Sequence, residues 1–191
     1  MSRPDDILDF WFGPPGSAER ERKREVWFKS DPGYDAVLRD SFLVDQQRAA
    51  AGEYDLWTST PEGSVALLLL LDQLPRNLYR DSPQAFATDA RARDIAGITV
   101  PRGFDQLLPP VWRWFVYLPF EHSERMHDQE RSLRLFGALP ATPEHDEAKD
   151  YAKRHYDVIK RFGRFPHRNA ILGRESTPEE IEFLKQPGSS F

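Results

Sequence analysis

A short helix-start signature occurs four times in this chain and limits its fold more than any other feature. Each copy reads Ser or Thr, then Pro, then Glu or Gln, and the copies begin at Thr60, Ser82, Thr142 and Thr177. The hydroxyl caps free backbone N–H groups, and proline at the first helical position loses no hydrogen bond. A glutamate in the first turn also interacts favourably with the helix dipole. The signature therefore predicts four helix starts.

The segments after these starts have the apolar spacing of helices. They predict helices over about residues 61–74, 83–98, 143–162 and 178–185. The first is apolar nearly all round from Val65 to Leu71, so we expect it at the centre of the core. Further helices without the signature are expected over residues 7–12, 18–28, 34–51, 110–118 and 121–139, with a break at Pro119 before the last.

No segment alternates with a period of two residues, so we expect no sheet. The fold class that follows is all-α, with about eight or nine helices. The joints between the helices are short, which predicts that they pack as antiparallel hairpins. Because the 191 residues contain no linker and no low-complexity tract, we expect residues 1–191 to form a single α-helical domain.

The composition excludes several classes of function. The chain has no cysteine, so disulfides, thiolate metal sites and cysteine nucleophiles are impossible. Asp5 and Asp6 lie where a signal peptide would be apolar, and the longest apolar run, Val65 to Leu71, is far shorter than the roughly 20 residues that span a membrane. These features predict a soluble, cytoplasmic protein that does not bind membranes. The net charge of −5 disfavours nucleic acid as a partner.

The charge is spread unevenly along the chain. From Lys153 to Arg174 the sequence has seven basic residues and one acid, Asp157. Such a segment can bind an anion, or its bases can pair with acids elsewhere in the protein. The sequence leaves both interpretations open.

Three junctions at which an apolar helix stops near a proline carry a family resemblance. They read LDQLPRNLYR at residues 71–80, YLPFEHSE at 117–124 and RFGRFPHRN at 161–169. With ILDFWFG at 7–13 and LGRESTPEE at 172–180, the chain resembles the uncharacterised bacterial family called domain of unknown function 924 over nearly its whole length. The resemblance implies a helical fold similar to tetratricopeptide repeats. It brings no activity and no catalytic residues, and that fold mainly hosts protein-binding modules.

Polar side chains near these junctions are expected to face inward. Asp72 continues the apolar stripe of the helix before it, and Arg76, one turn on, can pair with it. His122 and His155 likewise lie on apolar helix faces. Burying such groups is unfavourable unless they are paired or hydrogen-bonded. The candidate ligand-binding residues are Asp72, Arg76, His122, Glu124, His155, Arg164, His167, Arg168 and Asn169.

Several interpretations of this cluster stay open. One is a soluble helical binding protein that holds a small anionic ligand, since the arginine fork binds two oxygens at once, or a protein partner. The alternative is a hydrolase-like enzyme acting on a phosphate- or carboxylate-bearing small molecule, with a histidine as general base. No complete catalytic motif is visible, so its catalytic residues stay unassigned. The third interpretation is a buried polar network that only clamps the helices together.

Neither a cofactor nor a metal is expected. The chain has no glycine-rich nucleotide-binding motif. Its single Glu-x-x-His, from Glu124 to His127, lacks the second copy that a di-iron helix bundle needs. The sequence makes no prediction of the oligomeric state.

Overall fold

The computed structural model describes residues 2–190, and within this range it is all-helical, without a β-strand. Nine α-helices within residues 2–190 confirm the all-α fold class and the expected number of helices. They are α1 (Pro4–Phe12), α2 (Pro32–Ala51), α3 (Pro61–Leu68), α4 (Leu74–Leu78), α5 (Asp89–Thr99), α6 (Pro110–Glu121), α7 (Met126–Gly137), α8 (Pro143–Phe162) and α9 (Pro178–Leu184).

Three of the four signatures begin an α-helix as predicted. The hydroxyls of Thr60, Thr142 and Thr177 accept backbone N–H groups in the first turns of α3, α8 and α9. Ser82 also caps a turn, but that turn is a short 3-10 helix, Pro83–Phe86, and α5 begins only at Asp89. The predicted helix over residues 83–98 is therefore wrong in its first turn. The Thr88 hydroxyl donates to the carbonyl of Leu71, and this tertiary contact holds the chain at the start of α5.

Three other predicted helices differ from the structure. The helix expected over residues 121–139 corresponds to α7, which begins only at Met126, because Glu121 belongs to α6. Helix α6 continues through Pro119 to Glu121, because a proline in the last turn removes only one hydrogen bond there. The expected helix over residues 18–28 is absent apart from the short 3-10 turn Glu25–Trp27. Instead, the side chains of Arg24 and Trp27 donate to the carbonyl of Trp11, and so satisfy free acceptors at the end of α1.

The long apolar helix contains a π-helical segment, Leu69–Gln73, that joins α3 to α4 without a break. The Leu74 N–H donates to the carbonyl of Leu69, five residues back. Pro75 has no N–H to offer the carbonyl of Leu71, which accepts from Thr88 instead. Such π segments are frequent at functional sites, and this one positions Asp72 and the residues after it.

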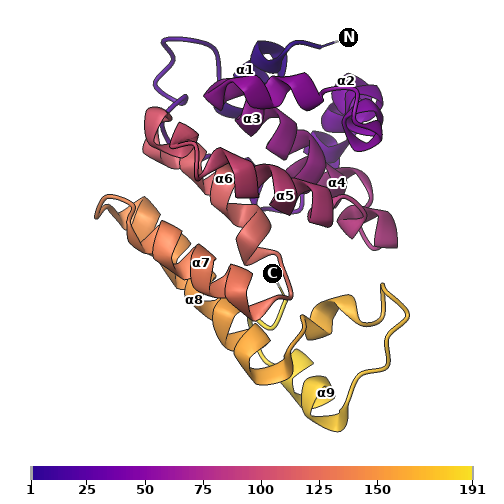
Figure 1. Ribbon diagram of the computed structural model, residues 1–191. Coiled ribbons are helices and arrows are strands. Elements are labelled where there is room, and N and C mark those ends of the chain that lie inside the picture. Colours follow the sequence, from indigo (N-terminus) through magenta and orange to yellow (C-terminus); the bar gives the residue numbers. More distant parts are fainter. Residues whose placement is uncertain (1, 191) are drawn as a thin grey trace.

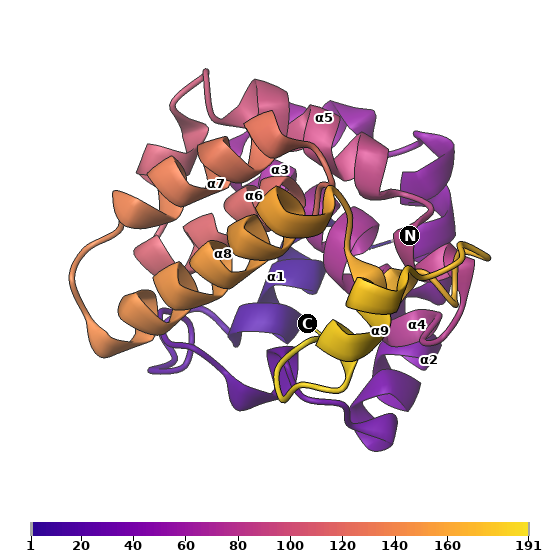
Figure 2. The same cartoon turned by 90° about the horizontal axis from the view of Figure 1, so that it is seen from below.

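The same long helix lies at the centre of the core, as the sequence predicts, since Val65 to Leu71 have no exposed surface. Helices α1, α5 and α6 pack around α3. Helices α7 and α8 form a hairpin that packs against α6 and lies below α1 to α6 in Figure 1. Figure 2 shows this hairpin from below, with α9 beside the end of the chain. Similarity to tetratricopeptide repeats stays a prediction.

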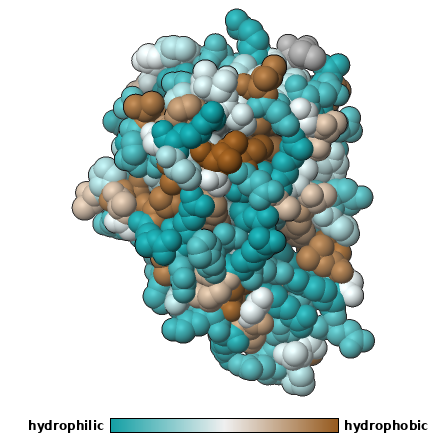
Figure 3. All heavy atoms as spheres, in the orientation of Figure 1, coloured by the Kyte–Doolittle hydropathy of each residue, from teal (hydrophilic) through white to brown (hydrophobic). Residues whose placement is uncertain are grey.

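The face in Figure 3 is mostly hydrophilic, with hydrophobic atoms in small separate patches. Between residues 2 and 190, no helix combines the length and the apolar character needed to cross a membrane.

Candidate functional site

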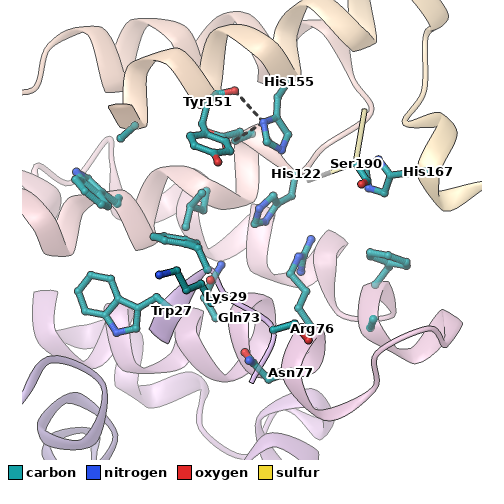
Figure 4. Close-up of a pocket in the computed structure, with 18 of the residues that line it drawn as sticks. Trp27, Lys29, Gln73, Arg76, Asn77, His122, Tyr151, His155, His167 and Ser190 are labelled. Carbon is teal, nitrogen blue, oxygen red and sulfur yellow. Dashed lines mark hydrogen bonds and ion pairs between the residues drawn. The ribbon is translucent and has the colours of Figure 1, made fainter. Parts of the chain in front are cut away.

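A cavity of about 670 Å³ lies between helices α6 and α8 on one side and the junction of the π-helix with α4 on the other. Its volume is in the range of small-molecule binding sites. Figure 4 shows His122 and His155 on one side of it and Gln73, Arg76 and Asn77 on the other. The aromatic part of the wall consists of Trp27, Phe28, Phe86, Trp114, Phe136 and Tyr151.

Five of the nine candidate residues line this cavity: Arg76, His122, His155, His167 and Arg168. Asp72 is buried directly behind His122 and Arg76. Glu124 lines a second, smaller cavity of about 400 Å³ that shares Phe86, His122 and Arg168 with the first. Arg164 and Asn169 line neither cavity.

Asp72 and His122 form a hydrogen-bonded pair at the cavity wall. The Nδ1 of His122 lies 2.9 Å from Oδ1 of Asp72. Burial raises the pKa of Asp72, but Arg76 and His122 outweigh it, and the pKa of this carboxyl falls below its usual range. Because Asp72 is ionised and can only accept, the His122 proton is on Nδ1 and the lone pair is on Nε2. Burial and the nearby Arg76 also lower the pKa of His122, so the ring is neutral.

Glu121, the residue before His122, is buried and uncharged. Burial, and then the negative charge of Asp72, raise its pKa well above the usual range. Its Oε1 lies 3.2 Å from Nδ1 of His155. Burial lowers the pKa of His155 well below its usual range, so the two side chains do not form an ion pair.

Hydrogen bonding fixes where the proton of Glu121 lies. Nδ1 of His155 is 2.9 Å from the carbonyl of Tyr151, which can only accept, so this nitrogen carries a hydrogen. Oε1 of Glu121 can share that hydrogen only as an acceptor. The proton of Glu121 is therefore on Oε2, which has no hydrogen-bond partner among residues 2–190.

Two arginines at the cavity differ in how their charge is balanced. Arg76 binds Asp89 through two hydrogen bonds of 2.9 and 3.0 Å and also lies 3.3 Å from Asp72. Arg168 is 3.6 Å from the same Asp89 carboxylate and donates to the carbonyl of His122. Its Nε is buried and without a partner in the described chain. Burial, and then repulsion by Arg76, lower the pKa of Arg168 to about 10.

The remaining candidates form a clamp outside the larger cavity. Glu124 receives two hydrogen bonds from Arg174 and one from the backbone N–H of Phe165. Arg164 binds Glu180 at 2.6 and 2.7 Å, and Asn169 donates to the same carboxylate. Arg161 pairs with Glu179. Much of the basic segment thus pairs with the protein's own acids, which is one of the two interpretations that the sequence left open.

His167 also lies at the cavity. Burial and the neighbouring Arg168 lower its pKa to about 4, so it is neutral near pH 7. Ser123 offers no nucleophile to His122, because its hydroxyl donates to Asp128. Among residues 2–190, no cluster of three or more His, Asp or Glu side chains could hold a metal ion.

Two important residues, Glu121 and Asp89, are not among the candidates predicted from the sequence. Glu121 lies inside one of the quoted motifs, beside His122, and a carboxylate after the apolar run from Trp114 to Phe120 is a usable signal. Asp89 carried no such signal, because its role depends on Arg76 and Arg168 reaching it from other parts of the chain.

Comparison with known proteins gives a family and a structural relative. The model of the family described as bacterial protein of unknown function (DUF924) matches residues 7–188. The chain is similar to the solved structure of a protein of unknown function, ATU0120 from Agrobacterium tumefaciens. The two are 40% identical, the match covers 95% of this chain and 96% of the other, and the TM-score is 0.85. No curated protein matches.

Proposed function

We propose, for this member of the DUF924 family of bacterial proteins of unknown function, that the larger cavity binds a small molecule with an anionic group and an apolar body. Membership of the family brings no activity with it. The anionic group is a carboxylate or a phosphate held by Arg168, and the body lies on the aromatic wall. The observation that carries this proposal is the position of Arg168, whose closest carboxylate is 3.6 Å away and shared with Arg76, and whose Nε has no hydrogen-bond partner among residues 2–190.

Arg168 differs from the other arginines of its segment in this respect. Arg164 and Arg174 each have a carboxylate to themselves, at 2.6 and 2.7 Å. Arg168 has only Asp89 as a partner, at 3.6 Å, and Asp89 is shared with Arg76. The side chain of Arg168 is nevertheless buried, with only 7% of it exposed. A buried cation is costly unless it is paired. An anion in the cavity would supply the missing partner through charge-assisted hydrogen bonds.

Four ionisable groups near Arg168 do not repel an anion, although the carboxylates of Asp81, Glu144 and Glu147 also line the cavity. The histidines His122, His155 and His167 are neutral, and so is Glu121, for the reasons given above. The aromatic side chains provide apolar area for the rest of the ligand. The rings of Phe86 and Phe165 lie 4.7 and 4.4 Å from the guanidinium carbon of Arg168 and hold it in place.

The test is calorimetric titration of the purified protein with a panel of aryl and alkyl carboxylates and phosphates. Arg168→Met is the informative variant, because methionine keeps the apolar stem between the two rings and removes the charge. A hydrogen bond to a charged group contributes about 1.5–3 kcal/mol. We therefore expect the variant to bind its best ligand about 10- to 150-fold more weakly.

Arg161→Ala is the matched control, since it removes one positive charge from the same segment at an exposed pair with Glu179. It should leave binding unchanged. Equal affinity of the Arg168→Met and parent proteins for every anion would reject the proposal. A large loss of stability in Arg168→Met without any ligand would instead support a purely structural network.

A further inference from the structure

The larger cavity also holds two groups that can move protons, and neither has a role in anchoring the anion. Nε2 of His122 carries a lone pair, and the ring is oriented by Asp72 at 2.9 Å. Oε2 of Glu121 carries a proton and has no hydrogen-bond partner within residues 2–190. Both side chains line the same cavity from the end of α6. Catalysis of proton transfer commonly uses one unprotonated base together with one protonated acid.

We propose that this cavity exchanges a proton on the carbon next to the ketone of a 2-oxo carboxylic acid that has an apolar or aromatic side chain. This inference rests on the proposed function, since Arg168 holds the carboxylate in both. Each other part of such a substrate meets a group already described. The ketone oxygen meets the Glu121 acid, the carbon–hydrogen bond meets His122, and the side chain meets the aromatic wall.

The proton balance of the step is closed. Nε2 of His122 takes the proton from the carbon, and the electron pair of that bond forms the carbon–carbon double bond of the enol. The former carbonyl π electrons move to the oxygen, which takes the proton from Oε2 of Glu121. Reversal returns both protons, and exchange of the His122 proton with water places a solvent hydrogen on the carbon.

Beside His122, neither a thiol nor the Ser123 hydroxyl offers a nucleophile for covalent catalysis. The chain has no cysteine, and the hydroxyl of Ser123 is bound to Asp128. Arg168 donates to the backbone carbonyl of His122 at 3.0 Å, which ties the anion anchor to the base. The rings of His122 and His155 lie 6.1 Å apart, and His155 in turn contacts Glu121. The anion anchor Arg168, the base His122 and the acid Glu121 are therefore neighbours at one part of the cavity wall.

The experiment follows deuterium incorporation at C3 of phenylpyruvate in D₂O by proton NMR, and measures binding of the same compound by calorimetry. We expect the parent protein to accelerate the exchange and His122→Gln to lose at least 100-fold of the acceleration. Glu121→Gln keeps a donor but cannot give up a proton, so it should lose about 10-fold. His127→Gln, an exposed histidine of α7, is the control and should exchange like the parent.

Asp72 acts through His122 and is a positioning residue. Asp72→Asn should lower the exchange rate while binding of phenyllactate, which has the same size and charge but no ketone, is retained. That readout separates orientation of the base from loss of the fold, because an unfolded variant would bind neither compound.

Each outcome decides between the two proposals. Phenylpyruvate that binds in an Arg168-dependent way but exchanges no faster than with His122→Gln overturns the catalytic inference and leaves the binding function standing. The same holds if other anions bind but 2-oxo acids do not. If no anion binds at all, the proposed function fails and the inference fails with it.

Discussion

The four arginines at positions 161, 164, 168 and 174 differ in the surroundings of their charges. Arg161 lies in an exposed pair, Arg164 and Arg174 each bind one carboxylate through two hydrogen bonds, and Arg168 has no carboxylate of its own. Sequence alone gives all four the same chemistry. Their difference comes from where Glu124, Glu180 and Asp89 lie in three dimensions, which local patterns do not predict.

The Arg164–Glu180 pair provides a prediction about stability. Glu180 is 2% exposed, and it accepts from Arg164, Asn169 and the backbone N–H of Thr177. Glu180→Gln removes the charge and turns one acceptor into a donor that faces Arg164. Breaking a buried pair costs about 3–5 kcal/mol, and the partial exposure of Arg164 puts the expected loss near 3 kcal/mol.

Urea unfolding of Glu180→Gln at pH 7 measures this loss. Glu179→Gln is the control, because its partner Arg161 is exposed and such surface pairs contribute only about 0–1 kcal/mol. Equal losses in the two variants would contradict a clamp at Glu180. Anion binding to the cavity should persist in both variants, since neither residue lines it.

At the scale of single elements, the sequence predicts what local chemistry controls. Thr60, Thr142 and Thr177 begin helices because capping and proline at the first position are local effects. The predicted start of α5 is wrong because a contact distant in sequence, from Thr88 to Leu71, fixes it. The predicted end of α6 is wrong because a proline in the last turn of a helix removes only one hydrogen bond. The π-helical segment, likewise, could not be read from an unbroken run of leucines.

The π-helical segment yields a prediction through the carbonyl of Leu71. This group has no donor from Pro75 and accepts from the Thr88 hydroxyl at 2.5 Å. Thr88→Val keeps the shape of the side chain but leaves the buried carbonyl without that donor, which costs about 1–3 kcal/mol. Thr88→Ser retains the hydroxyl and should lose far less. Thermal unfolding of the two variants compares them directly, and equal melting temperatures would show that the bond does not support the segment.

At the scale of the whole molecule, the cavity gathers ionisable side chains whose pKa values in the folded protein differ from those in the unfolded chain. Only part of this could be predicted: the sequence brought His122, His155, His167, Arg76 and Arg168 into one candidate cluster, and the structure places all of them at one cavity. The candidate cluster predicted from the sequence also includes Glu124, Arg164 and Asn169, which belong to the clamp. Distinguishing the two groups required the packing of α6, α8 and the segment after α8.

The buried histidines predict how stability depends on pH. His122, His155 and His167 have folded pKa values below the ordinary 6.5, so as pH falls through 6.5 the unfolded chain takes up protons first. Their contribution to stability is complete above pH 6.5 and is lost as pH falls, down to about 4 for His167. Glu121 acts oppositely: its folded pKa is raised, so its contribution is complete below the ordinary 4.5 and is lost as pH rises through the folded value.

Near pH 5.5, His167 leaves the unfolded chain with nearly one more proton than the folded one, because its folded pKa is about 4. His122 and His155 act in the same direction, and Glu121 acts in the opposite one. One proton corresponds to about 1.4 kcal/mol per pH unit, so His167 should lower the free energy of unfolding by roughly 1 kcal/mol per unit as the pH falls from 6.5 to 5. Urea titrations at several pH values measure this slope. His167→Gln should reduce it by about one proton, whereas the exposed His127→Gln should not change it. A slope that is the same in both variants would mean that His167 titrates in the folded protein as it does in the unfolded chain.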